Sequence, residues 1–130
     1  MTMTLDSRHL TLEPTDRLEV ITDTRALVMM IYSQQYPQSE KFGMESQIRR
    51  AVTSILLNLV EGNEFNDGSR TQHFRRALGS IKEVEECYRI SILLKFFENR
   101  EDIWEQIDKC AKKLNRLIIT VSRVESRGSY

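Results

Sequence analysis

The stretch Tyr36–Glu61, YPQSEKFGMESQIRRAVTSILLNLVE, decides how this chain folds. It opens with the turn formers Pro37 and Gly43, becomes periodic, and is followed by Gly62. At about 100° per residue, one helical face collects the apolar residues Met44, Ile48, Ala51, Val52, Ile55 and Leu59. This spacing predicts a core-facing helix that ends at about Glu61.

A polar stripe runs beside that apolar face, within about 60° on the helix. Its members are Gln47, Ser54, Asn58 and Glu61. The far side carries Leu56, Leu57 and Val60, and a helix that is apolar most of the way round is usually buried on more than one side. We therefore expect a central position or a subunit interface, where the polar side chains hydrogen-bond across the contact and set its register. The alternative is a polar binding site, but nothing nearby supplies a nucleophile with a base.

Three further helices are predicted on either side of this one. The first spans about Thr15 to Gln35, the third runs from the capping residue Ser69 to about Phe97, and the last begins at the cap Asn99. Their expected core positions are Leu18, Ile21, Leu27, Val28, Ile31, Tyr32, Phe74, Ala77, Ile81, Val84, Tyr88, Ile92, Ile103, Ile107, Leu114, Ile118 and Val121. Short connections between long helices imply antiparallel neighbours, so the prediction is an all-α, up-down four-helix bundle.

The chain of 130 residues is expected to form one bundle domain over 14–127, with a flexible arm at 1–13 and a tail at 128–130. No apolar run approaches the ~18 residues of a membrane span, and no secretory leader is recognised. These features favour a cytoplasmic protein in which Cys87 and Cys110 are reduced, partly buried thiols.

The net charge is zero, but the charges are unevenly distributed. Residues 83–108 contain eight acidic and three basic side chains, whereas 109–127 contain six basic and one acidic. The six basic residues fall within about 100° on the last helix: Lys109, Lys112, Lys113, Arg116, Arg123 and Arg127. Such a stripe is a candidate surface for a phosphate backbone, without aromatic rings to stack unpaired bases. The alternative is a solvated face.

Two further features point to contacts between helices or subunits. A second basic group, containing Arg49, Arg50, Arg70, Arg75 and Arg76, surrounds the loop between the second and third helices. There we expect Arg70 to pair with Glu61 and Glu64, which fixes the loop or a neighbouring subunit.

Gly79 lies in the middle of a helix, opposite its apolar face, at a cost of about 1 kcal/mol relative to alanine. We expect a neighbouring subunit or a partner helix to approach closely there. Together with the polar stripe, Arg50 and Gly79 complete the predicted interface.

Catalysis, metal binding and cofactor binding have little support in the sequence. His9 and His73 have no Cys or His partner at ligand spacing, and neither GxxxxGK nor GxGxxG occurs. The acidic cluster of Glu83, Glu85 and Glu86 is the only candidate for acid-base chemistry, and such a cluster on a helix is usually solvated. We expect a non-enzymatic protein without cofactor or metal.

The chain also resembles a known family. The resemblance extends from Tyr36 to Phe97 and is carried by Pro37, Glu40, Phe42, Gly43, Gln47, Arg49, Arg50, Ala51, Ser54, Ile55, Asn58, Glu61, Gly62, Phe74, Ala77, Gly79, Ser80 and Glu83. These residues are similar to the signature of the four-helix-bundle proteins of 23S rRNA intervening sequences. That resemblance implies a ring-like homopentamer and kinship with the accessory variability determinant of diversity-generating retroelements, which binds a reverse transcriptase and nucleic acid.

Two functions follow as hypotheses. The first is an oligomeric accessory protein that binds RNA or cDNA and has a reverse transcriptase as its partner. The basic stripes would repeat around a ring, so that weak phosphate contacts gain avidity. The second is a purely structural or protein-interaction oligomer, in which the acidic region of one subunit meets the basic stripe of another.

Overall fold

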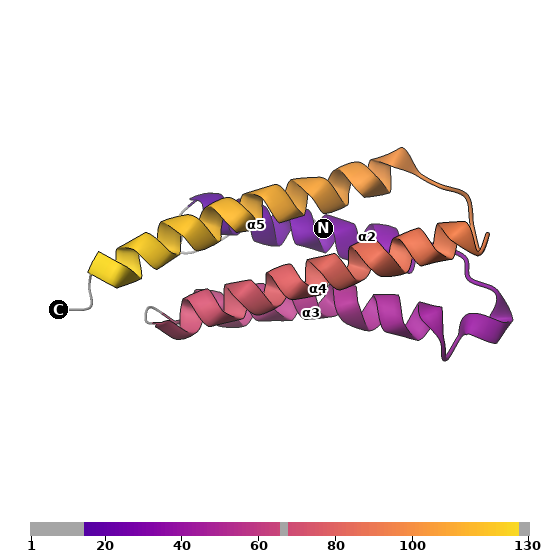
Figure 1. The fold of residues 1–130 in the computed structure, drawn as a ribbon, viewed down its shortest axis with the longest axis horizontal. Coiled ribbons are helices and arrows are strands. Elements are labelled where there is room, and N and C mark those ends of the chain that lie inside the picture. Colours follow the sequence, from indigo (N-terminus) through magenta and orange to yellow (C-terminus); the bar gives the residue numbers. More distant parts are fainter. Residues whose placement is uncertain (1–14, 66–67, 128–130) are drawn as a thin grey trace, which may run out of the picture.

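Four long helices make up the architecture (Figure 1). A computed structural model of the chain describes residues 15–65 and 68–127, and the side chains of 19–65 and 68–126. Over these residues the elements are α2 (Thr15–Tyr32), the short 3-10 helix η1 (Gln38–Glu40), α3 (Met44–Asn63), α4 (Gly68–Leu93) and α5 (Glu101–Arg127). No strand occurs in these two ranges, so the all-α prediction is confirmed. The predicted arm at 1–13 and tail at 128–130 lie outside the described residues.

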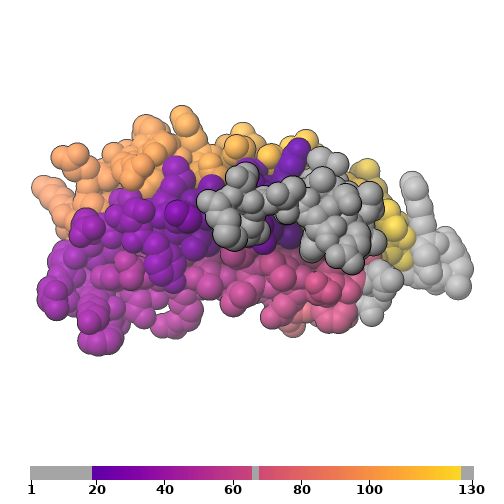
Figure 2. Space-filling model, turned by 180° about the vertical axis from the view of Figure 1, so that it is seen from behind, coloured from indigo at the N-terminus to yellow at the C-terminus, as the bar shows by residue number. Residues whose placement is uncertain are grey.

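Each helix packs against two others. The main contacts join α2 to α3, α3 to α4, α4 to α5, and α5 back to α2. Successive helices run in opposite directions along the long axis (Figure 1). Viewed from behind, α2 lies between α5 on one side and α3 on the other (Figure 2). The molecule is therefore a bundle with a single apolar core enclosed by four helices.

The core agrees with the helical periodicity of the sequence. All the apolar positions expected on α5 are buried, as are those of α3 and α4 except Met44 and Ile92, which pack partly buried against the core. Tyr32 was expected in the core, and this prediction was wrong because its side chain turns outward and is 44% exposed. The Arg49 guanidinium lies 4.7 Å from the Tyr32 ring centroid, which holds the ring on the surface between α2 and α3.

The entry into α3 depends on a carboxylate that the periodicity does not reveal. The α2 helix ends at Tyr32, three residues before the expected Gln35, and η1 follows. A side-chain oxygen of Glu40 then accepts a hydrogen bond from the Met44 backbone N–H at 3.0 Å. This bond satisfies one of the free N–H groups of the first turn and places negative charge at the positive end of the helix dipole.

The α4 helix ends at Leu93, four residues before the expected Phe97, and the backbone explains why. Lys95 has φ of 59°, which is the left-handed conformation. The Lys95 N–H donates to the Ile92 carbonyl at 3.0 Å, and the Phe96 N–H donates to the Ser91 carbonyl at 2.9 Å. These two bonds form a Schellman motif, which stops the helix by reversing the chain.

We expect Lys95→Gly to raise the free energy of unfolding by up to about 1 kcal/mol, because a side chain in the left-handed region is strained and glycine is not. The greater freedom of glycine in the unfolded chain offsets part of this gain. Urea denaturation followed by circular dichroism measures the change. A loss of stability in Lys95→Gly would contradict the assignment of Lys95 as the helix-terminating residue.

The start of α5 also differs from the expectation. The helix begins at Glu101, and Asn99 is not its immediate cap. The Asn99 side-chain oxygen instead accepts a hydrogen bond from the Trp104 indole N–H at 2.5 Å. The Arg100 backbone N–H donates to the buried Tyr88 hydroxyl at 3.0 Å, so the connection from α4 is tied to the core.

Candidate nucleic-acid and assembly surfaces

The basic stripe of α5 is divided between structural and free side chains. Lys113 lies 2.6 Å from a carboxylate oxygen of Asp23 on α2 and 3.6 Å from Glu19. Lys109 approaches the other Asp23 oxygen at 3.6 Å. Asp23 is mostly buried, with 14% of its side chain exposed. These two lysines therefore neutralise a carboxylate at the α2–α5 contact and help to hold the two helices together.

The remaining members of the stripe point outward. Lys112 pairs with Asp108 of its own helix at 2.9 Å, and both side chains are exposed. Arg116 and Arg123 are exposed, and neither has an ion-pair partner among the residues that the structure describes. Arg127 is the last residue of α5, and its side chain lies outside the described part. The outer face of α5 thus keeps two unpaired arginines.

We expect Asp23→Asn to lower the free energy of unfolding by about 1 kcal/mol, because it removes a charged hydrogen bond from a largely buried site. The hydrogen bond to Asp23 raises the pKa of Lys113 above its ordinary 10.5. A pKa that folding raises gives a contribution that is complete below the unfolded value and is lost as the pH rises through the folded value. The difference in melting temperature between the wild type and Asp23→Asn should therefore shrink at alkaline pH. A difference that stays constant through the Lys113 titration would contradict this role.

Ser54 and Asn58 form a polar line between α3 and α4. The Ser80 hydroxyl of α4 donates to the Ser54 hydroxyl at 3.0 Å. The Asn58 amide N–H donates to the Ser54 carbonyl at 3.0 Å and to its hydroxyl at 3.2 Å. His73 of α4 then forms a hydrogen bond through Nδ1 with the side-chain oxygen Oδ1 of Asn58, at 3.2 Å. Both predicted polar residues therefore bridge two helices of the same chain and fix the register of the α3–α4 pair.

His73 belongs to this line, although from the sequence it was considered only as a metal ligand. Its Nδ1 lies 3.5 Å from a Glu61 carboxylate oxygen, and its ring stacks on Phe65 with centroids 5.5 Å apart. Because these partners come from the end of α3 and the following loop, the contact joins the loop to α4. A histidine at the start of a helix has no distinctive spacing, so only the packed structure reveals the contact.

Gln47, Arg50 and Gly79 do not take part in this line. All three are exposed on the outside of the α3–α4 pair. A Cβ atom added at Gly79 would meet no heavy atom within 4 Å. The predicted close approach at Gly79 therefore does not involve another helix of the described chain. A neighbouring subunit there stays a prediction.

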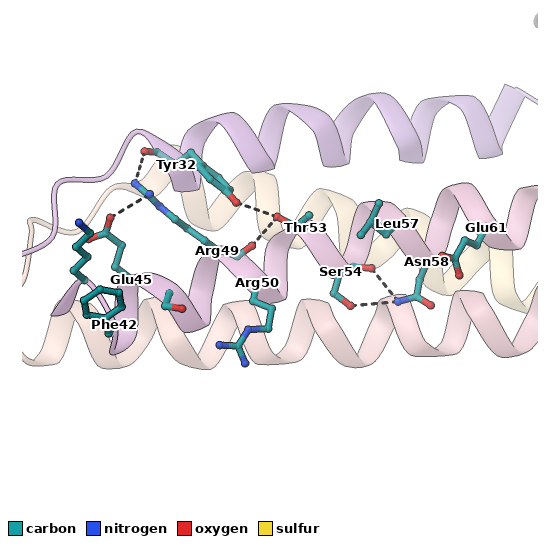
Figure 3. Close-up of a pocket in the computed structure, with 12 residues that line it drawn as sticks. Tyr32, Phe42, Glu45, Arg49, Arg50, Thr53, Ser54, Leu57, Asn58 and Glu61 are labelled. Atoms are coloured by element: carbon teal, nitrogen blue, oxygen red, sulfur yellow. Dashed lines mark hydrogen bonds and ion pairs between the residues drawn. The ribbon is translucent and has the colours of Figure 1, made fainter.

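A groove of about 740 Å³ runs along the outer side of α3 (Figure 3). It is lined by Tyr32, Lys41, Phe42, Glu45, Ser46, Arg49, Arg50, Thr53, Ser54, Leu57, Asn58 and Glu61. Phe42 is 90% exposed and Leu57 is 55% exposed. The Arg49 guanidinium is held at one end by Glu45 at 3.1 Å and by the Tyr32 carbonyl at 3.3 Å (Figure 3). Four of the six predicted interface residues line this groove, which gives the far side of α3 an open surface of mixed character.

Arg70 was expected near Glu61 and Glu64, and this prediction was wrong. The Arg70 Nε atom lies 3.9 Å from a carboxylate oxygen of Glu125 on α5, and the Thr71 hydroxyl donates to the same carboxylate. The start of α4 faces α5 at this point because α4 lies between α3 and α5 in the bundle. The sequence placed Arg70 beside its neighbours in the chain, whereas packing places it beside the end of the last helix.

The described side chains offer few groups for chemistry. No set of three or more His, Cys, Asp or Glu side chains within this part of the chain is arranged to hold a metal ion. Cys87 and Cys110 are buried free thiols, and burial raises the pKa of Cys110 to about 11 and that of Cys87 above 9.0. Glu85 and Glu86 both pair with Arg89, at 3.6 and 3.1 Å. Among the four described helices, none has the length and apolarity to cross a membrane.

The comparisons with known proteins give one result. Residues 16–119 match the model of a family described as 23S rRNA-intervening sequence protein. The match spans α2, α3, α4 and most of α5, which are the helices that build the core. No curated protein gives a significant match. Because the family match covers most of the chain, this protein belongs to the 23S rRNA-intervening sequence protein family.

Proposed function

We propose that this protein is a non-enzymatic, oligomeric accessory protein that associates with nucleic acid. The observation that carries the proposal is the pair Arg116 and Arg123, which are exposed on the outer face of α5 without an ion-pair partner in the described part of the chain. Unpaired, exposed cations attract phosphate groups and release the counterions that surround them. The family name refers to an intervening sequence of ribosomal RNA, which is consistent with an association with nucleic acid.

The proposed assembly is a ring-like homopentamer, as the resemblance implies, and its proposed location is the cytoplasm. The groove along α3 supports an assembly because it exposes Phe42 and Leu57 beside charged residues, and exposed apolar patches often mark interfaces. In a ring, Arg116 and Arg123 recur on every subunit, so weak phosphate contacts gain avidity. A reverse transcriptase of a diversity-generating retroelement is the proposed protein partner, and its support is the resemblance to the accessory variability determinant.

Light scattering on the purified protein, alone and with a structured RNA, tests the proposal. We expect a mass of about five subunits by the resemblance, and a further increase when RNA is added. A monomer would contradict the assembly, and a pentamer whose mass does not change with RNA would contradict the nucleic-acid role.

Charge reversal at Arg116→Glu and Arg123→Glu sharpens this test, because neither side chain holds the fold together. The expected result is an intact oligomer that no longer binds RNA. Arg25→Glu with Lys95→Glu is the matched control, since both residues are exposed and the total charge changes by the same amount. Lys113 is unsuitable for reversal because a carboxylate there would face Asp23.

A second candidate is a protein-interaction oligomer without nucleic-acid binding. The observation that counts against nucleic-acid binding is that Lys109, Lys112 and Lys113 each pair with an acidic residue of the same chain, which lowers the positive charge that the stripe offers to phosphate. The same reversal distinguishes the two functions. Under this second function, Arg116→Glu with Arg123→Glu dissociates the oligomer, and the wild type shows no affinity for RNA.

A further inference from the structure

The first half of α4 carries basic residues that the α5 stripe does not include. Residues 68–82 contain four basic side chains and no acidic one. Arg70 turns to Glu125, but Arg75, Arg76 and Lys82 are exposed, and none of these three forms an ion pair with a described residue. These three side chains therefore carry positive charge that no ion pair with a described residue neutralises.

The packing of α4 on α5 places two of these residues on the edge of α4 that borders α5. Near the start of α4 the Thr71 hydroxyl binds Glu125, and near its end the Arg89 guanidinium lies 5.4 Å from the Trp104 ring centroid. Between these two contacts the helices run antiparallel (Figure 1). Equal steps of about 1.5 Å per residue place Lys82 level with about Lys112.

Helical geometry gives the direction of these side chains. At about 100° per residue, Arg75 and Lys82 fall within about 40° of Thr71 and Arg89, the two residues that contact α5. They therefore project from the edge of α4 that borders α5. By the same geometry Lys112 lies about 80° from Trp104 on α5, and Arg123 and Arg116 follow at about 100° and 120°, so these three face outward. We call the outward-facing basic side chains of the two neighbouring helices the α4/α5 basic face. Its members are Arg75, Lys82, Lys112, Arg116 and Arg123.

This face is confined to one end of the bundle, and the exposed acidic residues Asp108 of α5 and Glu83 and Glu86 of α4 lie at its border. Residues 109–124 of α5, like 68–82 of α4, contain no Asp or Glu. Glu125 has only 17% of its side chain exposed and faces Arg70 and Thr71. The other acidic residues of both helices lie toward the other end, in 83–86 and 101–108. A polyanion therefore meets attraction at one end of the α4/α5 surface and repulsion at the other.

The chemistry of the face favours a duplex over a single strand. Residues 109–127 contain no aromatic residue, and Phe74 in the adjoining half of α4 is buried. The exposed aromatic side chains among the described residues belong to other elements, as with Tyr32, Phe42 and Phe65. Single strands are commonly held by stacking of bases on such rings, whereas a duplex presents two rows of phosphate at high charge density.

We propose that the α4/α5 basic face binds the phosphate backbone of double-stranded nucleic acid, with Arg75 and Lys82 of α4 contacting phosphates beside Lys112, Arg116 and Arg123. This inference rests on the proposed nucleic-acid association and adds the second helix of the surface and the form of the ligand. Because all of these contacts are to phosphate, binding is independent of sequence and falls steeply with salt.

Fluorescence anisotropy with a labelled DNA duplex, an RNA hairpin and single-stranded oligothymidine tests it in the full-length protein. We expect the wild type to bind both duplexes more tightly than the single strand. Arg75→Gln with Lys82→Gln should weaken duplex binding at least about tenfold at low salt, and lower the slope of log affinity against log salt by about 1.8, for two lost contacts. Arg25→Gln with Lys95→Gln removes the same charge elsewhere and should leave the slope unchanged.

The outcomes separate this inference from the proposed function. If Arg116→Gln with Arg123→Gln weakens binding but Arg75→Gln with Lys82→Gln does not, the α4 part is wrong and the nucleic-acid role stands. Tighter binding of oligothymidine than of the duplexes overturns the choice of ligand. A wild-type protein that binds none of the three probes overturns both proposals. Thermal melts of each variant, expected to match the wild type, confirm that these exposed substitutions leave the fold intact.

Discussion

Replacing Tyr88 with alanine is expected to lower the free energy of unfolding by about 3–5 kcal/mol, the largest effect of any substitution considered for this protein. Tyr88 is fully buried and belongs to the largest side chains of the core. Its ring lies 4.9 Å from the Trp104 ring centroid and 5.6 Å from that of Phe97. Alanine would leave a cavity between α4, α5 and their connection, and the rigid rings around it cannot collapse to fill it.

The Tyr88 hydroxyl adds a smaller contribution that can be measured separately. It accepts a hydrogen bond from the Arg100 backbone N–H, directly before α5 begins. Tyr88→Phe keeps the ring and loses only this bond, at an expected cost of about 1 kcal/mol. Urea denaturation followed by circular dichroism and by Trp104 fluorescence measures both variants. Equal losses in Tyr88→Phe and Tyr88→Ala would contradict the view that ring packing dominates.

The second large effect is expected at Gly62. Replacing this glycine with alanine should lower the free energy of unfolding, whereas the same replacement at Gly79 should raise it. A Cβ atom at Gly62 would lie 2.7 Å from Cε1 of Phe74 and 3.0 Å from Cβ of His73. Phe74 is 1% exposed and cannot move aside without disturbing the core. Gly62→Ala is therefore expected to lower the free energy of unfolding by about 1–3 kcal/mol, although alanine is the better helix former.

Gly79→Ala is the matched control, because it makes the same chemical change in an adjacent helix. A Cβ atom at Gly79 meets nothing within 4 Å, so the higher helix propensity of alanine should raise the stability by about 0.5–1 kcal/mol. Thermal and urea denaturation compare the two variants at a concentration at which light scattering gives the mass of a monomer. A destabilising Gly79→Ala under those conditions would contradict the open space found there.

Gly79 also separates folding from assembly. Gly79→Leu should leave the fold intact but weaken the oligomer if a neighbouring subunit approaches α4 closely at this point. Light scattering over a dilution series measures the dissociation. An oligomer of unchanged mass and stability would contradict the predicted contact at Gly79.

The core residues could be predicted from the sequence because a helix that buries one face has apolar residues at periodic positions. Ile48, Ile55 and Leu59 on α3 recur at the spacing of one helical face, and all are buried. The same holds for the apolar face of α5, which is long and regular. Helix ends were predicted less well, since Lys95 in the left-handed conformation gives no signal comparable to a glycine.

The candidate surfaces could be predicted only in part from the sequence. The sequence placed six basic residues on one stripe of α5, but it could not show that Asp23, far away in the chain, neutralises Lys109 and Lys113. It also could not place Arg75 and Lys82 on the edge of α4 next to α5, because the packing between these helices is set by contacts such as that of Thr71 with Glu125.

The sequence by itself determined the four helices, their buried faces and the absence of strands in the described part, because these depend on interactions within a few residues of the chain. Only the tertiary structure decided which charges are free, which glycine is crowded and which polar residues bridge helices. The sequence placed Gly62 at the end of a helix and Gly79 in the middle of one, but it could not show that Phe74 lies against the backbone at Gly62 whereas Gly79 faces open space. These differences depend on side chains that packing brings together, and the apolar pattern of one helix does not indicate which residues of another helix lie against it.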